Sequence, residues 1–272
     1  MPYSTPGRAV AVPDQLWVLF RRVVPPTEVI RPQGGGRRRA GDREALAAII
    51  FVATSGWTWR QLPPVFGPSW QTVYRRFAQW NRDRVWARLH RVVLDELGVR
   101  GELDWSRCAI DSVSLRAGKG GPLTGPNPTD RGKLGSKIHL ITDRNGLPLS
   151  LGVSGANMPD SQGLEPLVRG IPPVRSRRGP RRRRPKKLHA DKGYDYDHLR
   201  RWLRGRGICH RIARKGHESS QRLGRHRWVV ERTVSWLAGC RRLHRRYERR
   251  AEHFLAFVAI AAALIGYRRL SR

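Results

Sequence analysis

The sequence predicts an α/β protein in which a mixed sheet with flanking helices follows a small all-helical domain. Residues 42–97 carry apolar side chains at helical spacing, between capping residues and glycine-containing turns. From Trp105 the pattern changes to short apolar stretches with a period near two. Asn145-Gly146, between two such stretches, is a strong hairpin signal. We expect three parts, over residues 1–41, 42–100 and 101–272.

The N-terminal part combines a helix with a basic linker. Residues 13–24 predict a short helix, and residues 25–41, with three consecutive glycines and three consecutive arginines, predict a flexible linker. Three helices follow, over residues 42–54, 69–80 and 83–97. Asp42, Ser69 and Asp83 are their expected N-caps. Short helices joined by a turn with glycine predict a module like a helix-turn-helix.

The second of these helices is the candidate for DNA recognition. Helical periodicity directs Val73, Phe77 and Trp80 toward the core. The outward residues would be Gln71, Thr72, Arg75 and Arg76. These residue types read base edges in DNA. A plain helical bundle with a solvated basic face is the alternative. Three tryptophans are expected in the core rather than stacked on bases: Trp57, Trp59 and Trp70.

The third part alternates strands and helices. Strands are expected over residues 107–116, 137–142, 147–153, 188–191 and 208–213. Helices are expected over residues 160–169, 195–203 and 225–240. In a mixed sheet of this order the first and fourth strands lie side by side. Asp111 and Asp191 would then meet despite their separation along the chain.

Three acids form the candidate active site. Asp111 lies inside a short apolar strand, where an ionised carboxylate needs a salt bridge, solvent or a metal ion. Asp191 ends another strand, and Glu231 lies in a helical segment; the spacings are 80 and 40 residues. Hard cations such as Mg²⁺ or Mn²⁺ take oxygen ligands, and two such ions can flank a scissile phosphate. The acids therefore predict a site for two metal ions.

The charge balance indicates a polyanionic partner. The net charge is +33 and the pI is about 11.7. These values are far from those of ordinary enzymes that act on small molecules, and they indicate nucleic acid as the leading candidate for the partner. GC-rich coding DNA also inflates arginine content, but it does not explain the deficit of acids. The basic stretch of residues 175–187 is an exposed loop that either binds phosphate or is merely solvated.

The remaining composition argues against zinc, disulfides and a membrane. Cys108, Cys209 and Cys240 show no pairing pattern, which fits a reducing cytoplasm, and they lack zinc-finger spacing. The apolar run of residues 254–265 is shorter than the ~20 residues that span a bilayer. We expect a packed terminal helix, no signal peptide and a cytoplasmic protein.

Several motifs together resemble the DDE-class transposases of bacterial insertion sequences, in the subgroup related to insertion sequence five. They are WRQLPP (59–64), GSKIHLITDRNGLPL (135–149), ANMPDSQ (156–162) and HADKGYD (189–195). The resemblance covers most of the chain. It implies a ribonuclease-H-like catalytic domain with Asp111, Asp191 and Glu231 as catalytic metal ligands. It also implies double-stranded DNA as partner, both element ends and target, and a homo-oligomer on DNA.

The resemblance also suggests which residues contact DNA. Arg227 matches the arginine four residues before the family's glutamate, whereas Gly224 and Ala238 replace its tyrosine and its basic residue. Those roles pass to Arg225 and Arg241, or are absent. Further expected contacts are Lys137, Lys192 and Tyr194. His139 is expected to be a hydrogen-bonded structural histidine, and Asp160 a helix cap.

The activity implied by the resemblance is to bind terminal inverted repeats, cleave the ends and join a 3′-hydroxyl to target DNA by two-metal phosphoryl transfer. A stand-alone nuclease of the same fold is one alternative. A non-catalytic DNA-binding protein, in which the acids are structural, is another.

Overall fold

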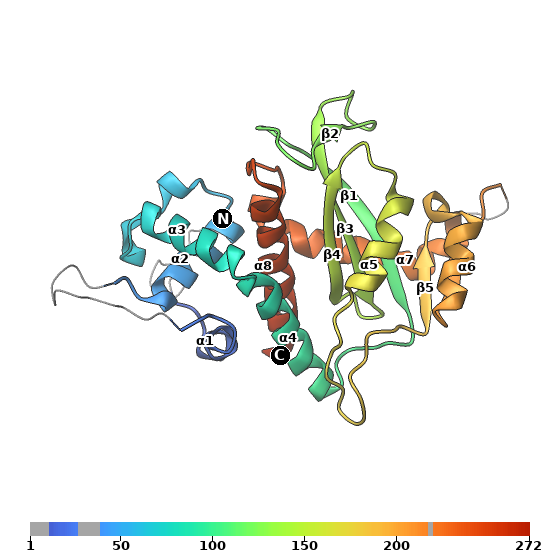
Figure 1. Cartoon of the computed structure of the whole chain (residues 1–272), viewed down its shortest axis with the longest axis horizontal. Coiled ribbons are helices and arrows are strands. Elements are labelled where there is room, and N and C mark those ends of the chain that lie inside the picture. Colours follow the sequence, from blue (N-terminus) through green and yellow to red (C-terminus); the bar gives the residue numbers. More distant parts are fainter. Residues whose placement is uncertain (1–10, 27–38, 217–219) are drawn as a thin grey trace.

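The structure is a computed structural model that describes residues 11–26, 39–216 and 220–272, without the side chains of residues 220–227. The helices are α1 (Asp14–Arg21), α2 (Asp42–Ser55), α3 (Trp70–Arg82), α4 (Val85–Arg100), α5 (Leu164–Gly170), α6 (Asp197–Gly205), α7 (Ser220–Ala238) and α8 (Ala251–Leu270). The strands are β1 (Cys108–Arg116), β2 (Gly125–Pro126), β3 (Leu134–Asp143), β4 (Pro148–Gly155), β5 (Lys187–Ala190) and β6 (Cys209–Ile212). Helices α1 to α3 gather on one side, the sheet lies on the other, and α8 stands between them (Figure 1).

The sheet has the order β2-β3-β1-β5-β6, with β4 paired to β3. Strand β3 is antiparallel to β1 and β4, whereas β5 is parallel to both β1 and β6. The predicted hairpin is confirmed, because Gly146 turns the chain between β3 and β4 with φ of 87°, which glycine adopts without strain. The predicted pairing of the first and fourth strands is also confirmed. Three antiparallel strands followed by two parallel ones are the ribonuclease-H-like order expected from the sequence.

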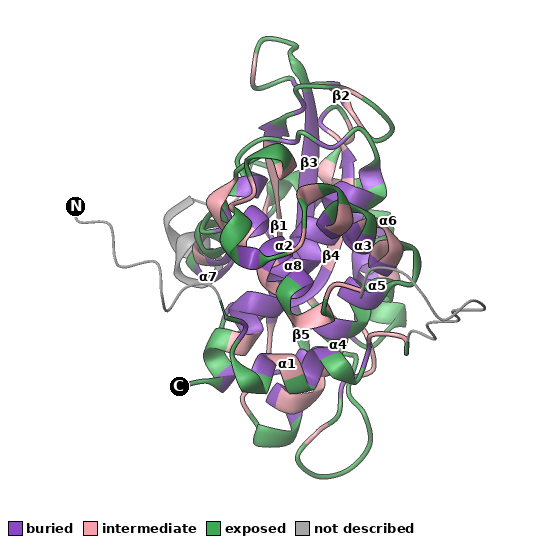
Figure 2. Cartoon of the chain, turned by 90° about the vertical axis from the view of Figure 1, so that its left-hand side faces the viewer, coloured by how far each residue is buried: buried purple, intermediate pink, exposed green. Residues whose placement is uncertain are grey.

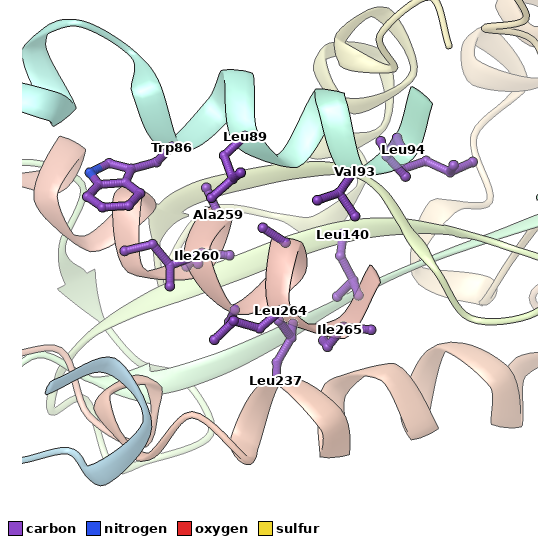
Figure 3. Close-up of a cluster of buried hydrophobic side chains, with 14 of the residues drawn as sticks. Trp86, Leu89, Val93, Leu94, Leu140, Leu237, Ala259, Ile260, Leu264 and Ile265 are labelled. Carbon is purple, nitrogen blue, oxygen red and sulfur yellow. The ribbon is translucent and has the colours of Figure 1, made fainter. Parts of the chain in front are cut away.

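Helices cover both faces of the sheet. Gly163, next to α5, lies against the His139 ring on one face, and Gly152 of β4 lies against Leu167 of α5. On the other face Leu140 of β3 packs with Leu237 of α7 and with α8 (Figure 3). Strand β1 is therefore enclosed between two helical layers, which fixes the position of Asp111 on it.

Helix α8 is the central core element. Its apolar side chains meet Trp86, Leu89 and Val93 of α4 (Figure 3). A Cβ on Gly266 would lie 2.6 Å from Val93 Cγ1, so glycine permits this close approach. Among the described residues α8 is the one helix long and apolar enough to cross a membrane, but 78% of its most apolar window is buried inside the protein (Figure 2). Its hydropathy therefore reflects core packing.

The helical part follows the predicted elements closely. Gly56 ends α2 with φ of 76°, and the Ser69 side chain caps α3 by accepting the Thr72 N–H at 3.4 Å. Two caps differ from the prediction, because Gly41 precedes α2 and Arg84 precedes α4, where Asp42 and Asp83 were expected. One hydrophobic core runs through helices and sheet. The division into residues 1–41, 42–100 and 101–272 stays a prediction.

Candidate active site

The strand register brings Asp111 and Asp191 together. Ala109 of β1 pairs with His189 of β5 in a parallel ladder. Two residues further along each chain stand Asp111 and Asp191. Because strand side chains alternate with a period of two, both carboxylates point to the face of the sheet that carries Ala109 and His189. The same face is covered by α7. Both carboxyl groups are only half-buried, so a ligand can reach them.

A tight turn holds Asp191 in place. The turn η4 (Lys192–Tyr194) follows β5 directly, and the Asp191 carboxylate accepts the Gly193 N–H at 2.9 Å. The next acid, Asp195, is structural: it pairs with Arg200 at 2.6 Å and accepts the Lys215 N–H at 2.9 Å. These hydrogen bonds hold the pKa of Asp195 below its usual value, with the Lys215 N–H as the main cause. Of the two acids in this motif, Asp191 faces the candidate site.

The third predicted acid, Glu231, lies on α7. Helix α7 buries Val229, Val230 and Thr233, while Glu231 between them is exposed. Thr233 Oγ1 donates to the Gly146 carbonyl at 2.6 Å, which anchors α7 against the β3–β4 turn. Arg225 and Arg227 lie in the same helix, but their side chains are outside the described part of the structure. The role of Glu231 as third ligand stays a prediction.

Asp160 connects the loop after β4 to β1. Its Oδ1 accepts the Ser112 hydroxyl at 2.7 Å and pairs with Lys137 Nζ at 2.7 Å. Ser112 is the neighbour of Asp111 but lies on the opposite face of the sheet. Lys137 is 9% exposed and also donates to the Met158 carbonyl, so the predicted DNA contact by Lys137 is not supported. The sequence identified Asp160 only as a cap; the structure gives it a positioning contact beside Asp111.

Two other predicted DNA contacts are buried. Tyr194 is 1% exposed, because the η4 turn directs its ring inward. Arg76 is 7% exposed, forms an ion pair with Asp42 and lies 5.6 Å from the Trp80 ring. The prediction that Arg76 points outward is therefore wrong, and the burial of Tyr194 does not support its predicted contact with DNA.

The other described candidates remain accessible. Gln71 and Arg75 are exposed on α3, and Thr72 is half-exposed. Lys192 beside Asp191 is exposed, as is Arg241 in η5 (Arg241–Leu243). His139 is confirmed as a structural histidine: its Nε2 lies 2.7 Å from Ser154 Oγ, and burial lowers its pKa to about 4, so that the ring is neutral.

The donor atoms suit a hard divalent cation. Two carboxylates on one sheet face attract Mg²⁺ or Mn²⁺ and supply the oxygen ligands that these ions prefer. Within the described residues, no group of three or more His, Cys, Asp or Glu side chains is close enough to hold a metal. The Asp111–Asp191 pair thus fits part of a metal site.

Residues 105–265 match the Transposase DDE domain family, and this segment contains all three predicted acids. The chain belongs to this family. Residues 12–90 match a second family, described as a putative transposase of the IS4/5 family. Membership makes the chain a transposase, an enzyme that cleaves DNA and transfers strands with divalent metal ions, and it bears out the resemblance seen in the motifs.

Two relatives from Burkholderia cepacia are similar to this transposase. A putative transposase for insertion sequence element IS402 is 49% identical over 153 residues, which are 56% of this chain and 72% of the relative. An uncharacterized 16.2 kDa protein of insertion element IS402 is 38% identical over 118 residues, 43% of this chain and 80% of the relative. Among solved structures, the Mos1 mariner paired end complex with Mn aligns over 95% of this chain and 84% of that one, with 14% identity and a TM-score of 0.34.

Proposed function

We propose that this transposase binds the terminal inverted repeats of its own element, cleaves DNA at the ends and joins the 3′-hydroxyl to target DNA. The observation that carries the proposal is the β1–β5 register, which supports a paired arrangement of Asp111 and Asp191. The net charge of +33 supports double-stranded DNA as the substrate. A homo-oligomer on DNA is part of the proposal, since two ends must be joined to one target.

We infer that Asp111 and Asp191 hold two divalent ions, Mg²⁺ or Mn²⁺, with Glu231 as a further ligand. When bound, such ions activate the attacking oxygen and stabilise the leaving oxygen. The protein keeps the two carboxylates in position: β1 lies between β3 and β5, and Asp160 fixes the adjacent loop. The exposure of Lys192 beside Asp191 supports a contact between its ammonium group and a neighbouring phosphate.

The test of this function uses a duplex that carries the element's end and a labelled 3′ strand. With Mg²⁺ or Mn²⁺, we expect a nick at the end and then a longer labelled product when target DNA is added. Chelation of the metal should abolish both products. Cleavage without any joined product would instead support a stand-alone nuclease.

The basic surface predicts a steep salt dependence of DNA binding. Each phosphate that the protein neutralises contributes a slope of about −0.9 in log K against log salt on duplex DNA. We expect a slope of several units for an arbitrary duplex, measured by fluorescence anisotropy with chelator present. A slope near zero would show that the arginine excess does not contact DNA.

End recognition is expected from the exposed face of α3. Because Arg76 is buried, Arg75 is the exposed arginine next to Gln71 and Thr72 on this face, and a bidentate contact to a base is worth ~1–3 kcal/mol of discrimination. Arg75→Ala should weaken binding to the element's end more than binding to a scrambled duplex at fixed salt. Arg91→Ala is the matched control. Arg91 is exposed on α4, and its loss should weaken binding to both duplexes equally. The same equal loss for Arg75→Ala would exclude recognition by this face.

A further inference from the structure

A second concave site lies away from the acids, between the helical part and the sheet. The cleft has a volume of about 710 Å³ and is walled by η1 (Trp59–Gln61), α3, the loop after β1 and the segment of residues 242–253. We call it the aromatic–basic cleft. Its size is that of a site for a small ligand or one to two nucleotides, and it is too small to admit a duplex.

Two buried arginines fix the walls of the cleft. Arg246 is 1% exposed and donates to the carbonyls of Pro122, Leu123, Glu248 and Arg249 over 2.8–3.0 Å, and to Ser136 Oγ at 2.7 Å. Arg242 pairs with Glu248 at 2.7 Å and donates to the Trp57 carbonyl at 2.9 Å. Arg246 joins the loop after β1 to the segment before α8, and Arg242 joins that segment to the turn just before η1. The cleft is therefore preorganised.

The lining of the cleft carries positive charge. Arg60, Lys119, Arg249 and Arg250 line it and are exposed. None of these four cations forms an ion pair with any residue that the structure describes. The one acid in the lining, Glu248, is already paired with Arg242, and burial lowers the pKa of His253, which keeps it neutral. The net field in the cleft attracts an anion.

Aromatic rings provide the rest of the lining. Tyr74 is 36% exposed and Tyr247 39% exposed, and Trp70 is half-buried with the Arg60 guanidinium 5.9 Å from its ring. Beneath them Trp59 packs against Phe77 and Phe257 of the core. Partly exposed aromatic rings beside unpaired cations are the combination that binds single-stranded nucleic acid, because bases stack on rings while phosphates meet the cations.

We propose that the aromatic–basic cleft binds unpaired nucleotides of the DNA strand on which the transposase acts. Lys119 follows β1, the strand that carries Asp111. From Asp111 to the end of β1 is about 17 Å at about 3.3 Å per residue, the span of roughly five nucleotides at about 3.4 Å each. A strand that passes the acids can thus enter the cleft. This inference rests on the proposed function for the identity of the strand, but its binding chemistry does not require cleavage.

The test compares two labelled oligonucleotides of about twelve nucleotides, within the site sizes of single-strand binders. One is an oligothymidylate and the other has the same phosphates without bases. The full chain is titrated with each in chelator, and the ratio of the two affinities measures base stacking. Trp70→Leu should lower this ratio about fivefold or more, because one stacked base is worth ~1–3 kcal/mol. Lys119→Ala should weaken binding to both oligonucleotides, because both carry phosphates.

Control variants separate stacking from damage to the fold. Trp70→Phe keeps an aromatic ring and should retain the ratio, and Arg201→Ala, exposed on α6 outside the cleft, should leave it unchanged. An unchanged ratio in Trp70→Leu, with circular dichroism as in the parent, would overturn the proposal. Chelator prevents cleavage, so this binding test does not depend on the proposed reaction. If Trp70→Leu lowers the affinity ratio but the parent chain never cleaves DNA, the proposed reaction is disproved and the cleft proposal stands.

Discussion

Asp111→Asn and Asp191→Asn are each expected to lower metal-dependent nicking of end DNA by about a thousandfold or more. An amide oxygen is a poorer ligand for a hard cation than a carboxylate, and losing ~4 kcal/mol of charge stabilisation in the transition state has this effect on rate. Duplex affinity in chelator should be retained or rise, because each change removes a negative charge next to the DNA. Single-turnover nicking with Mg²⁺ and with Mn²⁺, beside a binding titration, measures both effects.

The matched control for this pair is Asp197→Asn. Asp197 is an exposed acid at the start of α6, six residues after Asp191, and its substitution should leave nicking unchanged. Glu231→Gln is the separate test of the third ligand. Loss of nicking in this variant would place Glu231 in the site although its side chain is exposed here. Parental nicking by either aspartate variant would remove that residue from the active site.

The sequence predicted the sheet well because local patterns and connection rules determine it. Asn145-Gly146 sets the register of the β3–β4 hairpin, and apolar stretches of period two locate β1 and β3. The side-by-side position of β1 and β5 follows from the order of strands and crossover helices. Once β1 and β5 are neighbours and Ala109 pairs with His189, Asp111 and Asp191 lie side by side, because each follows its paired residue by two positions and strand side chains alternate with a period of two.

The errors arise where a side chain's direction depends on a partner far away in the sequence. Periodicity places Arg76 on the outer face of α3, but Asp42 at the start of α2 covers it and forms an ion pair. Lys137 lies on a strand whose register, opposite Ser114, puts it on the face away from Asp111. Asp160, distant in sequence, then holds its ammonium group. Neither the Arg76–Asp42 contact nor the Lys137–Asp160 contact can be predicted from composition or from spacing along the sequence.

The orientation of the helix that carries Glu231 is a further feature that the sequence leaves open. Val229, Val230 and Val234 leave the inner face of α7 ambiguous, because apolar residues surround the acid on several sides. The residue that selects the face is Thr233, which donates a hydrogen bond to the carbonyl of Gly146 in the β3–β4 turn.

Burial in residues 241–250 is also hidden from the sequence. This segment contains six arginines, a composition typical of solvated surface, yet two of them, Arg242 and Arg246, are buried. The tryptophans expected in the core include Trp57, which is 46% exposed.

Arg246 is the basis of the second large effect, which concerns stability. Its guanidinium donates to four backbone carbonyls and one hydroxyl, all in the loop after β1, in β3 or in the segment before α8. Removing it breaks all five hydrogen bonds, of which those to the Glu248 carbonyl and to Ser136 Oγ are buried, and each buried group left unsatisfied costs about 1–3 kcal/mol. The hydrophobic stem of methionine recovers part of the packing but none of the hydrogen bonds.

Arg246→Met is therefore expected to lower the free energy of unfolding by about 3 kcal/mol or more, measured by urea denaturation with chelator present. Arg245→Met is the matched control. Arg245 is next to Arg246 in the sequence but is exposed, and a surface substitution of this kind usually changes the free energy of unfolding by no more than about 0.5 kcal/mol. The midpoint should fall for Arg246→Met with little change in the denaturant slope, because the surface buried on folding is nearly the same. If both variants unfold at the same urea concentration, Arg246 does not hold the sheet and the C-terminal segment together, and the walls of the cleft have another support.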